Sequence, residues 1–236
     1  MKSSWIVFKQ EHNSRHDLAR ESHDGFEFRD IGWIEQMRVL LRDYGRVSGA
    51  RVLDPFGGLG TTLLACAELG FDGYATEIEA SRVEAARSRL RRAGVDASKF
   101  LHGSALDLPF EDGFFQLILT SVPYFGAGEA SHENWSAGGD QLYLESDYAK
   151  YCEMLAKVAS ECHRVLTPGG VVVMCAQNTR VKGKWVPLAW DVFRALSGPF
   201  RMHEERVILY EDVEREKSSD PFATNRSHEY VLIGEK

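Results

Sequence analysis

The chain has 236 residues, of which 44% are hydrophobic and 27% charged, the balance of a soluble globular protein with one domain and at most a modest extension. Its formal net charge of −7 disfavours the broad basic surface that most nucleic-acid binders need, and its first residues contain no apolar run long enough for a signal peptide or a membrane span. Its four cysteines lie far apart with no CxxC pair, which argues against disulfides and a zinc site and favours a reducing, cytoplasmic compartment. We therefore expect no metal, and from the lack of an apolar run no membrane partner.

The first half of the chain alternates between predicted strands and helices. Residues 1–30 are polar without a clear period, and we expect them to be an N-terminal extension. Residues 31–44 place Ile31, Ile34, Met37 and Leu41 on one helical face. The next predicted elements are a strand at 51–54, a glycine turn at 58–61, a helix at 62–69, a strand at 74–78, a helix ending at 92, and strands at 100–102 and 115–120.

The second half continues the alternation after a long loop at 121–145. Ser146 is the predicted N-cap of a helix, which has Tyr151, Leu155, Val158 and Cys162 on one face. A Pro-Gly-Gly turn at 168–170, a strand at 171–174, a helix at 187–196 and strands at 206–210 and 229–233 follow. Helices and strands of this length predict an α/β fold, a doubly wound Rossmann-like mostly parallel sheet with an antiparallel C-terminal hairpin. Without a dividing linker, residues 31–236 form one domain.

The sharpest motif is a glycine turn directly after the first strand of this alternation. Asp54 ends the strand, and three glycines between 57 and 60 let the backbone pass close to a ligand before a helix begins. In an open α/β sheet, ligands bind at this edge, outside the carboxyl ends of the strands. The turn lacks the Gly-Lys-Thr/Ser of a phosphate loop and the GxGxxG of a dinucleotide site, so neither ligand is expected.

The segment 54–62, DPFGGLGTT, resembles the DPFxGSGTT signature of the S-adenosylmethionine-dependent amino-methyltransferases that act on adenine N6 or cytosine N4 in DNA. Leu59 stands where that family has serine. The resemblance implies a class I methyltransferase that uses S-adenosylmethionine as its cofactor. The cofactor-binding residues implied here are Asp54, Pro55, Phe56, Gly57, Gly58, Gly60, Thr61 and Thr62.

Two later segments complete the expected cofactor site. Glu77, at the end of the second strand and about twenty residues after the glycines, stands where an acid accepts hydrogen bonds from ribose hydroxyls, with Ile78 beside it. Ser104 and Ala105 follow the third strand in a segment similar to the family's GDAxxLPF, whose acid contacts the adenine amino group. Serine in place of that acid is a departure.

Ser121-Val122-Pro123-Tyr124 follows the fourth strand and resembles the family's catalytic (D/N/S)PPY motif. The resemblance implies that the Ser121 hydroxyl and the carbonyl of Val122 accept hydrogen bonds from the target amine, and that Tyr124 stacks on a flipped base. Valine keeps the carbonyl acceptor but loses the fixed φ of proline, which loosens the turn. Serine in the first position favours cytosine N4 over adenine N6.

Further similarities are the Pro-Gly-Gly turn that ends RVLTPGG at 164–170, a basic loop at 181–184 and the RSHEY segment at 226–230. The aromatic residues of the loop 121–145, Trp135 among them, either stack on a base or anchor the loop to the core. His132 in the same loop has no His or Cys partner at ligand spacing, so it is not expected to bind a metal. Five arginines between 82 and 92 are interpreted as a solvated helix face. Residues 1–30 would close over the cofactor, as the family's amino-terminal segment does. The predicted substrate-binding residues are Phe125, Arg180, Lys182 and Lys184.

The sequence therefore predicts a methyltransferase that methylates an exocyclic amino nitrogen of a nucleic-acid base, with DNA cytosine N4 or adenine N6 preferred. No inserted segment is long enough for a separate target-recognition domain, so a partner protein is one source of specificity. Two alternatives remain open: an amino-methyltransferase of RNA or of a small molecule, and a catalytically inactive cofactor-binding regulatory subunit.

Overall fold

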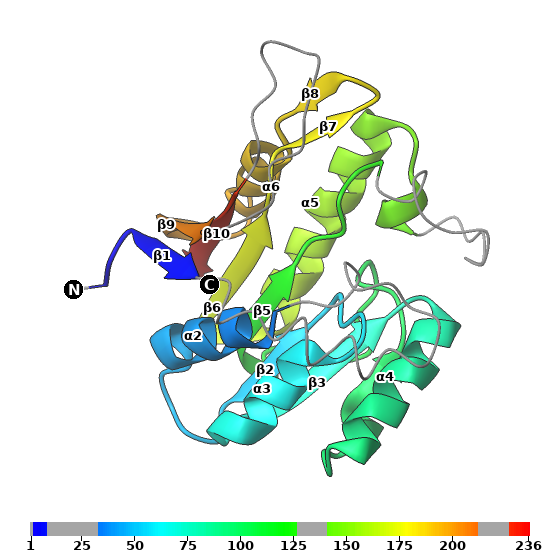
Figure 1. Cartoon of the computed structure of the whole chain (residues 1–236), viewed down its shortest axis with the longest axis vertical. Coiled ribbons are helices and arrows are strands. Elements are labelled where there is room, and N and C mark those ends of the chain that lie inside the picture. Colours follow the sequence, from blue (N-terminus) through cyan, green and yellow to red (C-terminus); the bar gives the residue numbers. More distant parts are fainter. Residues whose placement is uncertain (1, 9–32, 127–140, 212–226) are drawn as a thin grey trace.

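The computed structural model describes residues 2–8, 33–126, 141–211 and 227–236, and these residues build one eight-stranded sheet with the strand order β1-β9-β10-β6-β5-β2-β3-β4. Figure 1 shows the sheet running through the molecule, with the ends of β5 and β6 toward the top. Its strands are β1 (Trp5–Phe8), β2 (Arg51–Asp54), β3 (Asp72–Glu77), β4 (Phe100–His102), β5 (Phe115–Ser121), β6 (Leu166–Ala176), β9 (Arg201–Tyr210) and β10 (His228–Glu235).

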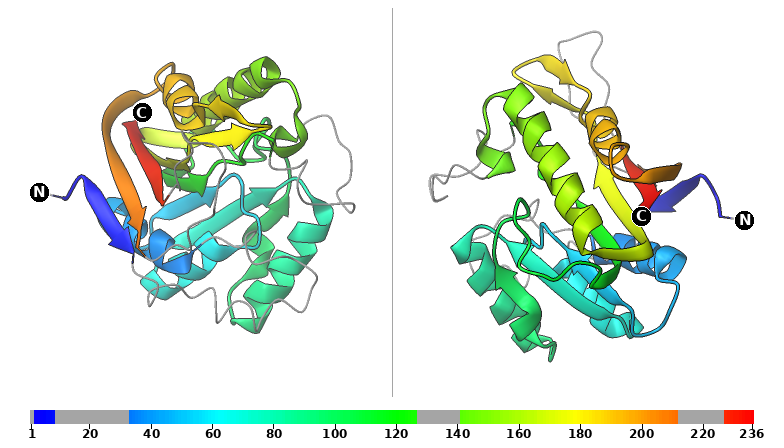
Figure 2. Two further views of the ribbon diagram at one scale, coloured as in Figure 1. Left: turned by 45° about the horizontal axis from the view of Figure 1, so that its top comes forward. Right: turned by 180° about the vertical axis from the view of Figure 1, so that it is seen from behind.

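Helices cover both faces of this sheet (Figure 2). They are α2 (Ile34–Tyr44), α3 (Thr61–Leu69), α4 (Ala80–Arg92), α5 (Tyr148–Val165) and α6 (Leu188–Leu196), with short 3-10 turns at Ala97–Lys99 and Leu142–Leu144. The apolar faces of α5 and α6 pack on one side of the sheet, against residues such as Ile118 and Val172. On the other side, α2 and α3 pack against residues such as Leu119 and Val173, which alternate with the first set along β5 and β6.

The predicted fold class is confirmed. Among the described strands of this sheet, the pairings β1–β9, β5–β6, β5–β2, β2–β3 and β3–β4 are parallel, and β10 runs antiparallel to its neighbours β9 and β6. The predicted bounds of β2 and β4 are those observed. The predicted buried face of α5, from Tyr151 to Cys162, lies in the core.

Three predictions about local structure were wrong or incomplete. The N-cap of α5 is Asp147 rather than Ser146, because the Asp147 carboxylate accepts hydrogen bonds from the N–H groups of Ala149 and Lys150. The basic loop at 181–184 is part of a two-stranded hairpin, β7 (Thr179–Val181) and β8 (Lys184–Val186). Within the predicted N-terminal extension, β1 pairs in parallel with β9 at the edge of the sheet. The expected closing role of the extension falls mainly on residues outside the described ones.

Candidate active site

Asp54 lies at the carboxyl ends of the central strands β2 and β5 and connects the segments that meet there. Its side chain is buried, and its two carboxylate oxygens accept hydrogen bonds from the Phe56 N–H (3.1 Å), the Thr120 hydroxyl (2.6 Å) and the Thr62 hydroxyl (2.5 Å). Burial raises the pKa of Asp54, and these three donors oppose that shift. The carboxylate thus joins β2, the first turn of α3 and the end of β5, which fixes the glycine turn relative to the segment at 121–124.

The glycine turn needs its glycines for two different reasons. A Cβ at Gly57 would lie 2.8 Å from the Ala75 Cβ and 2.8 Å from the Phe100 ring, so the backbone packs directly on the sheet there. Gly58 and Gly60 have φ angles of +51° and +80°, which side-chain-bearing residues rarely adopt. At Gly58 a Cβ would approach nothing closer than the Phe56 carbonyl oxygen at 3.9 Å, so this side of the turn is open to a ligand.

The turn leads into the amino end of α3, where the first backbone N–H groups lack intrahelical partners. The N-cap residue is Gly60, which offers no side-chain cap, and the first turn of the nine-residue helix carries no acid. A ligand carboxylate fits here, because the N–H groups and the helix dipole both favour negative charge. Thr61 and Thr62, predicted to bind the cofactor, form this first turn, and both side chains are buried.

Arg89 of α4 holds the glycine turn through two hydrogen bonds. The sequence did not lead us to expect this role. The buried Arg89 guanidinium donates from Nη1 to the Leu59 carbonyl and to the Thr61 hydroxyl, both at 3.0 Å. The interpretation of the five arginines as a solvated face is therefore wrong for Arg82 and Arg89, both of which are buried. Their spacing of seven residues puts them on the same face as Val83 and Leu90, and this period was the available signal.

Glu77 ends β3 beside the glycine turn. Its Oε2 accepts a hydrogen bond from the Gly58 N–H at 3.0 Å, and its Oε1 accepts one from the Glu79 N–H at 2.9 Å. Burial raises the pKa of Glu77, while these N–H donors and the charge of Arg82 oppose the shift. Each carboxylate oxygen keeps a second lone pair for a ligand hydroxyl. The neighbouring Ile78 is half-buried, and its carbonyl lies 3.0 Å from His102 Nε2.

Ser104 and Ala105 lie in the next turn along the same edge of the sheet. The Gly103 N–H bonds to the Glu77 carbonyl at 3.0 Å, which holds this turn beside β3. The Ser104 hydroxyl accepts a hydrogen bond from the Leu106 N–H at 3.1 Å, so it shapes its own turn and retains a proton to donate. Ala105 is buried.

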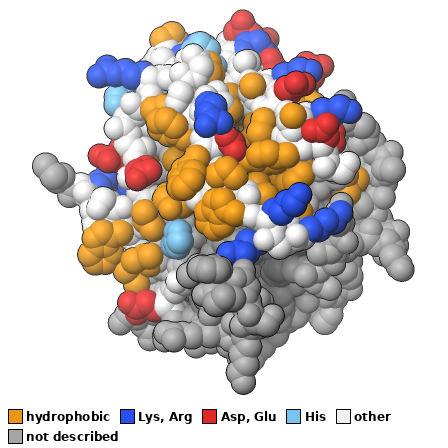
Figure 3. Space-filling model, turned by 90° about the horizontal axis from the view of Figure 1, so that it is seen from above, with side chains coloured by type: hydrophobic (Ala, Val, Ile, Leu, Met, Phe, Trp, Pro, Cys, Tyr) orange, Lys and Arg blue, Asp and Glu red, His pale blue; other side chains and the backbone are white. Residues whose placement is uncertain are grey.

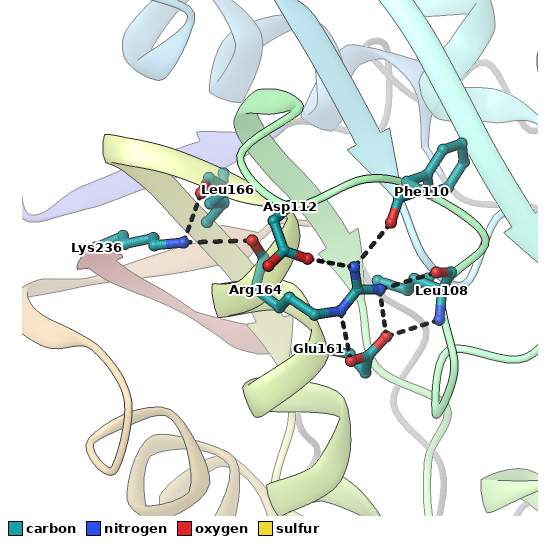
Figure 4. A network of polar contacts seen from close by, with 7 residues as sticks. All are labelled: Leu108, Phe110, Asp112, Glu161, Arg164, Leu166 and Lys236. Atoms are coloured by element: carbon teal, nitrogen blue, oxygen red, sulfur yellow. Dashed lines mark hydrogen bonds and ion pairs between the residues drawn. The ribbon is translucent and has the colours of Figure 1, made fainter.

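Arg164, in the last turn of α5, fastens the segment that follows Ser104 (Figure 4). Its guanidinium donates to the carbonyls of Leu108 (2.9 Å) and Phe110 (2.8 Å) and pairs with Glu161 and Asp112. Glu161 in turn accepts a hydrogen bond from the Leu108 N–H at 2.8 Å, and the Arg164 guanidinium lowers the pKa of Glu161. The chain between β4 and β5 is therefore held on α5.

The Ser-Val-Pro-Tyr turn at 121–124 is held through its own backbone groups. Ser121 pairs with Cys175 at the end of β5, and the Val122 N–H donates to the Cys175 carbonyl at 3.1 Å. The Pro123 carbonyl accepts a hydrogen bond of 2.6 Å from the hydroxyl of the fully buried Tyr151. The expected loosening at Val122 is offset, because proline has no N–H with which to make the bond to β6.

Tyr124 is held by a residue that the sequence analysis did not include in the site. Its hydroxyl donates to Glu229 Oε1 of β10 at 3.1 Å, and its ring packs against the core. Burial raises the pKa of Tyr124 well above its ordinary value, and the Glu229 carboxylate raises it further. Tyr124 is therefore a neutral hydrogen-bond donor. Glu229 belongs to the RSHEY segment, but its proximity to Tyr124 depends on the order of strands in the sheet.

The predicted substrate-binding residues lie on two segments that meet. Phe125 packs its ring on Tyr148 and Tyr151, with centroid distances of 4.9 and 5.5 Å, so it anchors the start of the long loop on α5. The next residue, Gly126, passes so close to β7 that a Cβ would lie 2.7 Å from a Val181 methyl. Arg180, Lys182 and Lys184 are exposed on the β7–β8 hairpin. His132 and Trp135 lie outside the described residues.

Figure 3 shows the molecule from above, with hydrophobic side chains across the middle of this face and Lys and Arg side chains near them. Within the described part of the chain, no three His, Cys, Asp or Glu residues are grouped to hold a metal ion. Among the same residues no helix has the length and apolar composition that crossing a membrane requires.

Comparison with known proteins gives the family. Residues 46–213 match the methyltransferase domain family. A demethylmenaquinone methyltransferase of Clavibacter sepedonicus is 32% identical over 60% of the chain and 46% of that protein. A tRNA (guanine(10)-N2)-dimethyltransferase of Methanothermobacter thermautotrophicus is 25% identical over 60% of the chain and 37% of that protein. The chain thus matches less than half the length of either relative.

Among solved structures, TrmN from Thermus thermophilus superimposes with a TM-score of 0.62 at 22% identity, over 95% of the chain and 53% of that protein. This likeness shows the class I fold. The glycine turn, the open amino end of α3 and the acid that ends β3 all fit an adenosyl amino acid. The chain belongs to the methyltransferase domain family, and its cofactor is S-adenosylmethionine.

Proposed function

We propose that this chain transfers the methyl group of S-adenosylmethionine to an exocyclic amino nitrogen of a nucleic-acid base. The observation that carries the proposal is the hydrogen bond between Thr120 and Asp54. Thr120 immediately precedes the Ser121–Tyr124 turn, and Asp54 begins the glycine turn. The bond therefore sets the proposed amine-binding turn against the proposed cofactor turn.

The chemistry requires hydrogen-bond acceptors more than a strong base. An amine conjugated to a base ring is a weak nucleophile, because its lone pair is delocalised into the ring. The Ser121 hydroxyl and the Val122 carbonyl would accept its two N–H groups and direct the lone pair toward the methyl group. When bound, S-adenosylmethionine would supply a methyl group on a sulfonium, and the electron pair of the S–C bond would pass to sulfur as the N–C bond forms. The methylated nitrogen, which carries a positive charge, would then lose a proton to water.

The cofactor contacts follow from the geometry of the turns. We assign the methionine carboxylate to the amino end of α3, the ribose hydroxyls to Glu77, and the adenine to the turn containing Ser104 and Ala105. In this assignment Asp54 acts through the shape of the turn, since its oxygens are already engaged by three protein donors.

The nucleic-acid substrate is supported by the hairpin and by one relative. Arg180, Lys182 and Lys184 add positive charge to an otherwise acidic chain, on the element that Gly126 of the loop after Tyr124 touches. A protein similar to this chain is named as a guanine-N2 methyltransferase of tRNA, and guanine N2 is an exocyclic amine. The candidate acceptors are thus guanine N2 in RNA and, from the motif resemblance, cytosine N4 or adenine N6 in DNA.

The test is methyl transfer from labelled S-adenosylmethionine to RNA, to single- and double-stranded DNA, to free nucleosides and to a demethylmenaquinone. We expect a methylated base amine in polymeric nucleic acid, and Ser121→Ala is expected to lower kcat strongly. Replacing Arg180, Lys182 or Lys184 by Ala should reduce the salt dependence of nucleic-acid binding by about one charge each. Turnover of the quinone or of free nucleosides alone would refute the nucleic-acid substrate. Tight cofactor binding without transfer to any acceptor would favour a regulatory subunit.

A further inference from the structure

A line of polar groups crosses the α2 face of the sheet at the ends of β5, β6 and β10. Ser121 follows Leu119 by two residues on β5, so both point to this face, and its strand partner Cys175 lies beside it on β6. Cys175 pairs with Val231 of β10, and Glu229 precedes Val231 by two residues. The alternation therefore places Ser121 and Glu229 on the same face, on either side of Cys175.

The Tyr124 hydroxyl bonds to one of these two side chains and is influenced by the other. It donates to Glu229 Oε1 at 3.1 Å, and the Ser121 hydroxyl is near enough to lower the pKa of the phenol, against the effect of Glu229. A phenol has a single O–H, and that of Tyr124 donates its hydrogen bond to Glu229. The phenol oxygen can still accept a hydrogen bond from another group. The Tyr124 oxygen is therefore available to accept a hydrogen bond from the Ser121 hydroxyl.

The Glu229 carboxylate is itself held from α2. Its Oε2 accepts a hydrogen bond from Gln36 Nε2 at 3.2 Å, and Gln36 Oε1 accepts one from the Tyr210 hydroxyl at 3.0 Å. Gln36 is buried, and the Tyr210 ring lies 4.4 Å from that of Trp33. Both oxygens of Glu229 are thus engaged by fixed donors, so the carboxylate has a defined position behind Tyr124.

We propose that Glu229 is a positioning residue that acts through Tyr124 to hold the Ser121 hydroxyl as a hydrogen-bond acceptor for the target amine. This inference rests on the proposed function. With the serine proton directed at Tyr124, the lone pairs of Oγ remain for the amine N–H, and successive hydrogen bonds polarise one another toward the carboxylate. In this arrangement a neutral serine can act as the acceptor at position 121, because the Glu229 carboxylate is connected to it through the Tyr124 hydroxyl.

The experiment is a double-mutant cycle on the full chain with Glu229→Gln and Tyr124→Phe. Glutamine keeps an acceptor for Tyr124 and can donate to Gln36 once the Gln36 amide rotates, with the Tyr210 hydroxyl then accepting from Gln36, so it removes the charge with little change in shape. We expect Glu229→Gln to lower kcat about tenfold or more, with the KM for S-adenosylmethionine within about twofold of wild type. In the Tyr124→Phe background the same change should cost less than about twofold, because its route to Ser121 is already broken.

The matched control is another phenol–carboxylate pair, Tyr148 and Asp191, which joins α5 to α6 at 2.5 Å. Tyr148→Phe and Asp191→Asn should leave kcat unchanged even where they lower stability. A ¹³C label on the tyrosine ring, with the Tyr124 signal assigned from Tyr124→Phe, gives a readout without turnover. Its Cζ resonance should shift in Glu229→Gln.

The outcomes separate the two proposals. Full kcat in Glu229→Gln, or an equal loss in the presence and absence of the Tyr124 hydroxyl, would overturn this inference and leave the proposed function standing. An unmoved Tyr124 resonance would also overturn it. A wild-type chain that methylates no amine would refute the proposed function and the catalytic role of Glu229 together.

Discussion

Replacing Gly58 by alanine separates backbone strain from ligand contact in the glycine turn. Gly58 has a φ of +51°, and its Cβ would meet no atom within 3.9 Å, so the only cost to the cofactor-free protein is the left-handed backbone, about 1–2 kcal/mol. Gly70 is the natural control. It ends the same helix α3 with a φ of +75°, and nothing lies within 4 Å of its Cβ position. Gly70→Ala therefore carries the same strain at a site far from the proposed ligand.

Both variants should lose about 1–2 kcal/mol in denaturant unfolding, which for a chain of this size lowers Tm by about 2–8 °C. Only Gly58→Ala should weaken S-adenosylmethionine, by about tenfold or more in calorimetric titration (about 1.4 kcal/mol), because the added methyl enters the open side of the turn. Equal affinity in the two variants would show that this side of the turn does not contact the cofactor, and the assignment of the turn would be wrong.

Three further predictions concern the surroundings of the site. Because burial raises the pKa of Glu77, its carboxylate protonates at a higher pH than usual. Cofactor affinity, measured by calorimetry over a pH series, should therefore fall as the pH drops through that raised value. Glu77→Gln should bind the cofactor more weakly and should lack this pH dependence. Tyr151→Phe leaves the Pro123 carbonyl without its 2.6 Å donor, so unfolding should show a loss of about 1–3 kcal/mol together with a lower kcat. Arg164 lowers the pKa of Glu161, so this pair stabilises the fold above the ordinary carboxyl pKa and the stabilisation is lost as pH falls through the lowered value; acid unfolding of Glu161→Gln should lack that component, and an unchanged acid profile would contradict it.

The sequence predicted the sheet where local signals and packing agree. The bounds of β2 match because an apolar run ends at Asp54 and the glycines begin directly after it. The hairpin β7–β8 was missed, because its short strands carry Arg180, Lys184 and the exposed Trp185 instead of an apolar face. The available signal in the sequence was Gly183. It takes a φ of +77° after Lys182 at +49°, and two successive positive φ angles form a tight hairpin turn.

The strand β1 could not be predicted from its own four residues. It pairs with residues 207–210 of β9, about two hundred positions away, and a strand of this length is stable only as an addition to an existing sheet. The same reason hides the contact between Tyr124 and Glu229, which are 105 positions apart. Each residue could be assigned to its own segment, but their contact follows from β6 lying between β5 and β10.

Serine at 121 and valine at 122, in the proposed amine-binding turn, have a common physical basis in this strand order. Because β6 lies beside β5, the Val122 N–H extends the pairing of the two strands by one residue, and this bond holds the turn that a proline would otherwise stiffen. Because β10 lies beyond β6, the Glu229 carboxylate lies on the same face as Ser121, across the Cys175 side chain, and it accepts a hydrogen bond from Tyr124. An acid at position 121 would place a second negative charge near Glu229, and the mutual repulsion would favour its protonated form. A neutral serine, which the family motif also allows, therefore suits this turn, and the departure at Val122 is compatible with an active enzyme.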